Sequence, residues 1–192
     1  GLTRVEDAQA AYDAGALYGG LIFVAASPRA VSVEQAEKVM QGAPLSYVGV
    51  FRNAPADDVV ATAAKLKLSA VQLHGDEDQA YISALRAQLG EQTQIWKALS
   101  VGTTLPPRNL EHVDKYVLDN GQGGTGKSFD WSLLTGETLD NVLLAGGLGA
   151  DNCVQAAKAG CAGLDFNSGV ESEPGIKDAS KLASVFRTLR AY

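Results

Sequence analysis

Short apolar runs alternate along the whole chain with longer stretches in which apolar residues recur at helical spacing. Gly, Asn, Asp and Pro separate the two kinds of segment, and these residues mark turns. The runs are short and rich in β-branched residues, so they predict strands. Seven strands are predicted, at residues 17–24, 47–51, 70–73, 94–98, 115–118, 142–145 and 163–166.

The stretches of helical period predict six helices and two weaker short ones. Ser32, followed by Gln35, has the capping-box spacing, and Thr3 and Asp178 are N-cap residue types placed before the first and last helices. The helices are predicted at residues 4–14, 32–41, 56–65, 77–89, 150–159 and 178–189, with weaker short pieces near Leu110 and Trp131.

Regular alternation of strands and helices predicts a parallel sheet, and nearly continuous apolar strands indicate burial on both faces. An open doubly wound sheet and a closed barrel both fit this pattern. Polar or glycine residues follow almost every strand at its C-terminal end, and a ring of loops explains that better than a single crevice. The sequence therefore favours an α/β fold of the (β/α)8 TIM-barrel type. The strand-end residues are Ser27, Arg29, Arg52, Asn53, His74, Lys97, Asp119, Gly146, Gly147, Asn167 and Ser168.

The chain has 192 residues, 46% of them hydrophobic, which suits one domain. A helix signal begins directly after Gly1 and Leu2, so a strand expected beside residues 17–24 and 163–166 is not in the sequence. Barrels of this class usually exceed ~200 residues. We expect residues 1–192 to be a single barrel domain truncated at its N-terminus, with the first β-strand missing.

Charge and cysteine content exclude several classes of protein. The net charge of −6 and the absence of a basic run argue against binding to nucleic acid or to an anionic membrane surface. Two cysteines are too few for a secreted disulfide scaffold, so a reducing cytoplasm fits best. The longest apolar stretches fall far short of the ~20 residues needed to span a bilayer.

Two glycine-rich turns follow the last two predicted strands. Gly146 and Gly147 lie after one, and Ser168 and Gly169 lie after the other. Glycines let backbone N–H groups approach an anion, and in barrels the last two strands commonly carry a phosphate site. A pair of glycines can also serve only a tight turn. Two such loops at these strands favour the phosphate site.

Asp119 ends an apolar strand, where it is either a cap for the next turn or a catalytic acid in apolar surroundings. The position alone does not separate these roles. Residues 121–127 beyond it are rich in glycine, which suits a lid over a substrate or a plain surface loop.

His74 and Arg29 are the other candidates. A lone histidine at a strand end is more often structural than catalytic, and a lone arginine is usually solvated. A substrate-binding role is favoured for Arg29 because Pro28 restrains its loop and because a guanidinium group fits a carboxylate or a phosphate.

Seven segments in the same order resemble phosphoribosylanthranilate isomerase, and together they span essentially the whole chain. The most characteristic is the Gly-Gly-x-Gly-Lys-x-Phe-Asp-Trp stretch at residues 123–131. The others are residues 1–4, 23–29, 48–51, 72–75, 144–148 and 167–171, the last followed by residues 174–178. The chain resembles most closely the isomerase domain fused to indole-glycerol-phosphate synthase in some bacteria.

The resemblance implies an Amadori rearrangement of N-(5-phosphoribosyl)anthranilate to 1-(2-carboxyphenylamino)-1-deoxyribulose 5-phosphate, with no metal or organic cofactor. By similarity, Asp119 is the general acid and Arg29 binds the anthranilate carboxylate. His74 lines the site, and Gly146, Gly147, Ser168 and Gly169 hold the phosphate.

The sequence departs from this family at one point. The general base of the family is a cysteine directly before the glycine that matches Gly1, and it is absent here. We expect a cysteine at that place in the physiological protein. Two alternatives remain: another sugar-phosphate barrel enzyme, whose metal ligands or paired aspartates are not evident, and a degenerate barrel that binds phosphate without turnover.

Overall fold

The computed structural model describes residues 1–121 and 128–192, and these contain a parallel sheet of seven strands in sequential order. Each strand pairs with the next along the chain, so the order never reverses. A doubly wound sheet needs such a reversal. The strands are β1 (Tyr18–Ile22), β2 (Ser46–Phe51), β3 (Ala70–Leu73), β4 (Gln94–Ser100), β5 (Lys115–Asp119), β6 (Val142–Leu144) and β7 (Gly163–Leu164).

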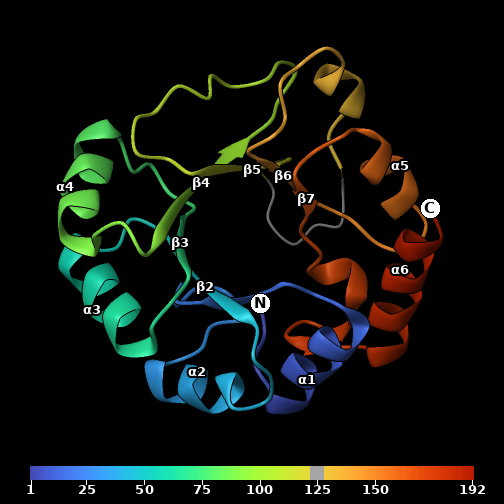
Figure 1. Ribbon diagram of the computed structural model, residues 1–192, viewed down its shortest axis with the longest axis horizontal. Coiled ribbons are helices and arrows are strands. Elements are labelled where there is room, and N and C mark those ends of the chain that lie inside the picture. Colours follow the sequence, from blue (N-terminus) through green and yellow to red (C-terminus); the bar gives the residue numbers. More distant parts are fainter. Residues whose placement is uncertain (122–127) are drawn as a thin grey trace.

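The helices form a ring around the strands, which is the TIM-barrel arrangement predicted from the alternation (Figure 1). They are α1 (Val5–Ala14), α2 (Val33–Met40), α3 (Ala56–Leu66), α4 (Gln79–Leu89), α5 (Cys153–Lys158) and α6 (Ala179–Ala191). Between α4 and α5, the ring is completed by the irregular segment before β5 and by the short helix η1 (Trp131–Leu134) (Figure 1). In the described residues, no helix has both the length and the apolar character needed to cross a bilayer.

Alternate residues of the strands face two different cores, as the period of a strand requires. The outward residues, such as Leu21, Val71 and Leu118, pack against the helices. The inward residues fill the barrel with a separate apolar cluster, formed by Val48, Ala70, Trp96, Val117, Leu143 and Ala145. A side chain two residues beyond an inward residue therefore points into the mouth of the barrel.

The predicted caps are partly confirmed. Ser32 and Gln35 form the capping box of α2, and the Asp178 carboxylate accepts hydrogen bonds from the first turn of α6. Thr3 does not cap α1: the N-cap is Arg4, and the Thr3 hydroxyl instead donates to the Gly175 carbonyl.

The weak helix predicted near Leu110 is wrong. Residues 103–110 have no regular structure, and the Leu110 N–H donates to the Tyr116 hydroxyl at 2.9 Å. Pro106 and Pro107 precede this point and supply no backbone N–H for a helical ladder. The short piece predicted near Trp131 is present as η1.

Residues 1 and 2 run along β1 inside the ring of helices (Figure 1). The Leu2 N–H donates to the Gly20 carbonyl in β1 at 2.7 Å, and the Gly1 nitrogen donates to Asn167 Oδ1 at 3.0 Å. Asn167 lies in the loop after β7. The main chain at Gly1 is therefore at the mouth of the barrel, between the two end strands of the sheet.

A small antiparallel hairpin, which the hydrophobic pattern did not predict, lies between β7 and α6. It consists of β8 (Glu171–Glu173) and β9 (Ile176–Lys177) and follows the short helix η2 (Ser168–Val170). Strands of two or three residues are too short to show a period. The hairpin places Glu171 and Lys177 beside the loop after β7.

Candidate active site

Two carboxylates and a histidine face the mouth of the barrel. Asp119 follows the inward residue Val117 by two positions, and Asp165 follows Gly163, which pairs with the inward Leu143. Both aspartates are close enough to His74, after β3, for their negative charges to raise its pKa. The sequence reasoning identified Asp119 and His74 but missed Asp165, because an aspartate after a strand has no distinguishing spacing.

Asp119 is half-buried and caps the turn after β5. Its Oδ1 accepts the Gly121 N–H at 2.7 Å, and its backbone carbonyl accepts the Val101 N–H at 2.7 Å. The turn-capping role that the sequence left open is therefore present. Because the same side chain lies on the inward face near His74, the cap also fixes where the carboxylate points.

His74 is held in its neutral form by its surroundings. Burial lowers the pKa of the imidazole, and the positive charge of Lys97 acts in the same direction. Asp119 and Asp165 oppose this shift without reversing it. The ring nitrogen Nε2 contacts the amide nitrogen of Gln72, which is buried two residues earlier on the inward face of β3. A neutral ring can accept that amide proton.

Arg29 is not a solvated surface arginine. Its side chain is 9% exposed, and Nε and Nη2 donate to Glu171 Oε1 at 2.8 Å and Oε2 at 2.7 Å. The backbone N–H of Arg29 donates to Ser27 Oγ at 3.1 Å. The guanidinium group is thus held from one side by a carboxylate 142 residues away in the sequence. No spacing in the sequence could have indicated Glu171 as this partner.

The Glu171 carboxylate also accepts a hydrogen bond from the ammonium group of Lys177. Burial alone would raise the pKa of the Glu171 carboxyl, but hydrogen bonds and charges from Arg29 and Lys177 lower that pKa to about 2. Burial lowers the pKa of Lys177, and Glu171 partly opposes that shift. Lys177 Nζ further donates to Asn167 Oδ1 at 2.7 Å.

The two glycine loops touch each other. A Cβ atom on Gly169 would lie 2.0 Å from the Leu148 carbonyl oxygen, so only glycine fits there. Gly146 and Gly147 have φ of 87° and 67°, in the region that favours glycine. The Asn152 amide braces their loop by donating to the Gly147 carbonyl at 2.9 Å and accepting the Gly149 N–H at 2.9 Å. The structure therefore brings the loop after β6, which contains Gly146 and Gly147, into contact with the loop after β7, which contains Ser168 and Gly169.

A second buried ion pair braces the loops after β2 and β3. Lys97 faces outward from β4, next to the inward Trp96, and its Nζ lies 2.9 Å from Glu77 Oε2. The Glu77 carboxylate also accepts the N–H groups of Asn53 at 2.7 Å and Gly75 at 2.8 Å. Lys97 therefore supports the strand ends from behind and does not point into the mouth.

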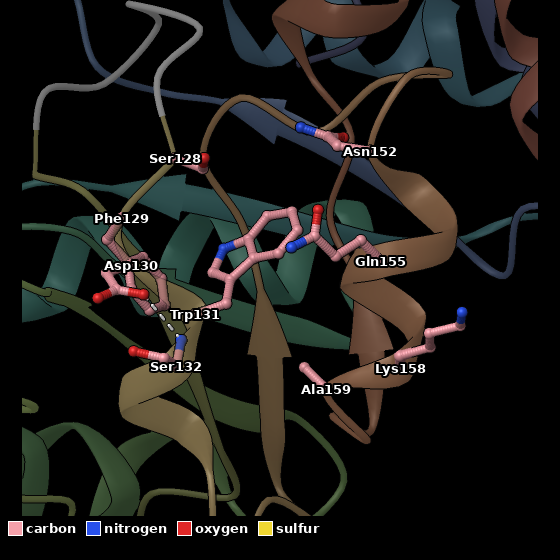
Figure 2. A pocket seen from close by; sticks show the side chains of 9 residues that line it. All are labelled: Ser128, Phe129, Asp130, Trp131, Ser132, Asn152, Gln155, Lys158 and Ala159. Carbon is pink, nitrogen blue, oxygen red and sulfur yellow. Dashed lines mark hydrogen bonds between the residues drawn. The ribbon is translucent and has the colours of Figure 1, made fainter.

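A hollow of about 470 Å³ lies beside the barrel, between η1 and α5 (Figure 2). Trp131, Gln155 and Lys158 are among the side chains that line it. It is a groove between two helical elements, whereas Asp119 and His74 lie at the strand ends. In the described ranges, no group of three or more His, Cys, Asp and Glu side chains is placed to hold a metal ion. The lid predicted at residues 121–127 lies, except for Gly121, outside the described residues.

Curated relatives with the same printed name match the chain along its full length. Tryptophan biosynthesis protein TrpCF of Salmonella typhi is 72% identical over 192 residues, and TrpCF of Yersinia pestis is 64% identical over 192 residues. The alignments cover 100% of this chain but only 42% and 40% of those proteins. The chain thus spans about two fifths of the length of the curated relatives that it matches.

Solved structures of similar fold carry a related name. The crystal structure of phosphoribosyl anthranilate isomerase from Thermus thermophilus superposes with a TM-score of 0.88 at 29% identity, covering 99% of this chain and 96% of that one. The isomerase from Thermotoga maritima gives a TM-score of 0.84 at 30% identity, covering 100% of this chain and 96% of that one. The family model for N-(5'-phosphoribosyl)anthranilate isomerase matches residues 1–188, and the chain therefore belongs to that family.

Proposed function

We propose that this chain catalyses the Amadori rearrangement of N-(5-phosphoribosyl)anthranilate to 1-(2-carboxyphenylamino)-1-deoxyribulose 5-phosphate in tryptophan biosynthesis, without a metal or organic cofactor. The observation that carries the proposal is that Asp119 and the two contacting glycine loops share one mouth of the barrel, in a chain of this family. An acid beside a phosphate site is what the reaction requires. A related structure, at 28% identity and a TM-score of 0.81, is that of phosphoribosyl anthranilate isomerase in complex with reduced 1-(o-carboxyphenylamino)-1-deoxyribulose 5-phosphate.

In this proposal Asp119 is the general acid. It donates its proton to the ring oxygen of the ribose, the bond from that oxygen to C1′ breaks, and a protonated Schiff base forms at the anilino nitrogen. A base then removes the proton from C2′ to give an enolamine, which tautomerises to the ketone. The contact of Asp119 with Gly121 supports this role because it fixes the direction of the carboxylate.

The substrate is held at its two anionic ends. Arg29 receives the anthranilate carboxylate, and the N–H groups of the loops at Gly146, Gly147, Ser168 and Gly169 receive the phosphate. His74 lines the site between them as a neutral ring. The burial and bidentate anchoring of Arg29 support this assignment, since a fixed guanidinium edge binds a carboxylate with little loss of entropy.

The general base and the first strand belong to the same proposal. We place a cysteine directly before Gly1, at the end of a strand between β1 and β7, so that residues 1–192 are the main part of one (β/α)8-barrel domain. The hydrogen bonds of Gly1 to Asn167 and of Leu2 to Gly20 support this, because they hold the main chain at the mouth.

We further propose that the domain is joined to indole-glycerol-phosphate synthase in a bifunctional cytoplasmic protein, with no role in binding nucleic acid or membranes. The support is that relatives named TrpCF are more than twice as long as this chain.

The test is turnover of N-(5-phosphoribosyl)anthranilate, followed by the loss of its fluorescence, in the full-length protein. A full-length sequence with a residue other than cysteine before Gly1, or absent turnover with phosphate binding intact, would point to the degenerate barrel instead. Turnover that is lost in Asp119→Asn establishes both the reaction and the acid.

A further inference from the structure

Glu171 is the centre of a buried charged cluster at one side of the mouth, and the proposed reaction gives it no role. Its carboxylate accepts hydrogen bonds from Arg29 Nε at 2.8 Å, Arg29 Nη2 at 2.7 Å, Lys177 Nζ at 2.8 Å and Gly175 N at 3.2 Å. The side chains of Arg29, Glu171 and Lys177 are 9%, 4% and 3% exposed. Every oxygen of the carboxylate is therefore occupied by a partner from the protein.

Stability alone is a poor explanation for such a cluster. Burying three charges removes them from water, and apolar residues of similar volume often stabilise a protein as well or better. The cluster does fix the orientation of the Arg29 side chain. Two parallel hydrogen bonds to one carboxylate fix the plane of the guanidinium group of Arg29, which a single contact would leave free to turn.

The same cluster reaches the loop expected to hold phosphate. Lys177 Nζ donates to Asn167 Oδ1 at 2.7 Å and to the Asn167 carbonyl at 3.2 Å. Asn167 directly precedes Ser168 and Gly169. The backbone of Lys177 is itself fixed, because its N–H donates to the buried Asp7 carboxylate at 3.0 Å. Glu171 and Lys177 therefore connect Arg29 to the Ser168 loop through buried contacts at Glu171 and partly buried hydrogen bonds at Asn167.

We propose that Glu171 and Lys177 are positioning residues for the two anionic ends of the substrate. Glu171 orients Arg29 toward the carboxylate of the aromatic ring, and Lys177 fixes the Asn167 loop relative to Arg29. One rigid unit thereby sets the separation between the carboxylate site and the phosphate site. This inference rests on the proposed function, and it makes Glu171 a residue that acts through Arg29 on the preference for a carboxylate on the aromatic amine.

The test compares two substrates in the full-length protein. N-(5-phosphoribosyl)anthranilate carries the ring carboxylate, and N-(5-phosphoribosyl)aniline lacks it. The quantity measured is the ratio of their kcat/KM values, in wild type and in Glu171→Gln. We expect the ratio to fall by about tenfold or more in the variant, mainly through KM, because a charge-assisted contact to the ligand is weakened. A purely structural role would lower both kcat/KM values equally and leave the ratio unchanged.

Glu77→Gln is the matched control. Glu77 is also buried, pairs with one lysine and accepts two backbone N–H groups, but it does not contact Arg29. We expect Glu77→Gln to leave the ratio at the wild-type value. An equal fall of the ratio in both variants would overturn the proposal, as would an unchanged ratio in Glu171→Gln.

Two further variants keep the test decisive if Glu171→Gln does not fold. Glu171→Asp keeps the charge but shortens the side chain, and it should lower the ratio in the same direction. Arg29→Lys removes the fork that Glu171 holds, so adding Glu171→Asp to it should lower the ratio no further. Failure of the wild type to convert either substrate would instead contradict the proposed function, and this inference would fall with it.

Discussion

Asp119 and His74 illustrate how far a single residue can be interpreted without its neighbours. Both are polar residues at strand ends, and the sequence left each with a structural and a functional reading. The structure adds that both face the same mouth, and that Asp119 and Asp165 act electrostatically on His74. The interpretation of Arg29 changed most. Its sequence context favoured a solvated arginine, but the structure shows a buried side chain that is paired with Glu171.

Replacing Asp119 by Asn is the first prediction at this scale. The amide keeps the size of the side chain but cannot donate an acidic proton, so kcat should fall by about 10²–10⁴-fold with a small change in KM. Steady-state turnover of N-(5-phosphoribosyl)anthranilate by the full-length variant measures this. A kcat within a few-fold of wild type would remove Asp119 from the role of general acid.

The second prediction concerns the charge of His74. Its pKa in the folded protein lies below the ordinary 6.5, chiefly because of burial, so the ring stays neutral where an unfolded histidine begins to protonate. Its contribution to stability is therefore present above pH 6.5 and is lost as the pH falls below that value. An NMR titration of the His74 ring resonances from pH 8 to pH 5 checks this. A midpoint at or above 6.5 would contradict it.

At the scale of elements, the pattern of apolar residues predicted the seven strands of the parallel sheet and the six α-helices found in the described residues, with ends shifted by a few residues. The prediction worked because strands buried on both faces form short continuous apolar runs, whereas helices with one apolar face show apolar residues at helical spacing. It failed for the helix near Leu110, and it did not find the hairpin of β8 and β9. The conformation of these segments depends on prolines and on contacts with distant residues, and not on a periodic pattern of apolar residues.

Gly169 tests the contact between the loops after β6 and β7. In Gly169→Ala the new methyl group meets the Leu148 carbonyl, so the loops must separate, at a cost of about 1–3 kcal/mol in unfolding free energy. Phosphate binding should weaken as well. Urea unfolding and titration with inorganic phosphate measure the two effects.

The control for this substitution is Gly102→Ala. A Cβ at Gly102 meets nothing within 4 Å. We expect it to change the unfolding free energy by no more than about 0.5 kcal/mol. Equal effects of the two substitutions would show that the contact between the loops is not what requires glycine at position 169.

At the scale of the whole molecule, the sheet is one layer curled inside a ring of helices, and distant parts of the chain meet at its mouth (Figure 1). The cluster of Arg29, Glu171 and Lys177 fastens the loop after β1 to the hairpin before α6. A buried carboxylate with two cationic partners makes the stability of the barrel sensitive to acid.

The prediction at this scale is a loss of stability in acid that depends on Glu171. Its pKa is lowered from 4.5 to about 2, so the stabilisation is complete above pH 4.5 and is lost as the pH falls toward 2. The shift corresponds to roughly 3 kcal/mol of unfolding free energy. Urea unfolding at several pH values between 6 and 2 should give a shallower dependence in Glu171→Gln than in wild type. Equal slopes would mean that the ion pair is not titrating in this window.

The sequence by itself determined the class of fold, the order of the elements, the glycine loops and the position of Asp119 at a strand end. These follow from local periods, turn chemistry and residue types, which act between near neighbours in the chain. Only the tertiary structure decided that Arg29 is anchored by Glu171, that Asp165 faces His74, and that Gly169 rests on Leu148. Each of these contacts joins residues from different strands or loops. The curling of the sheet brings them together, and no spacing along the chain indicates which residues will meet.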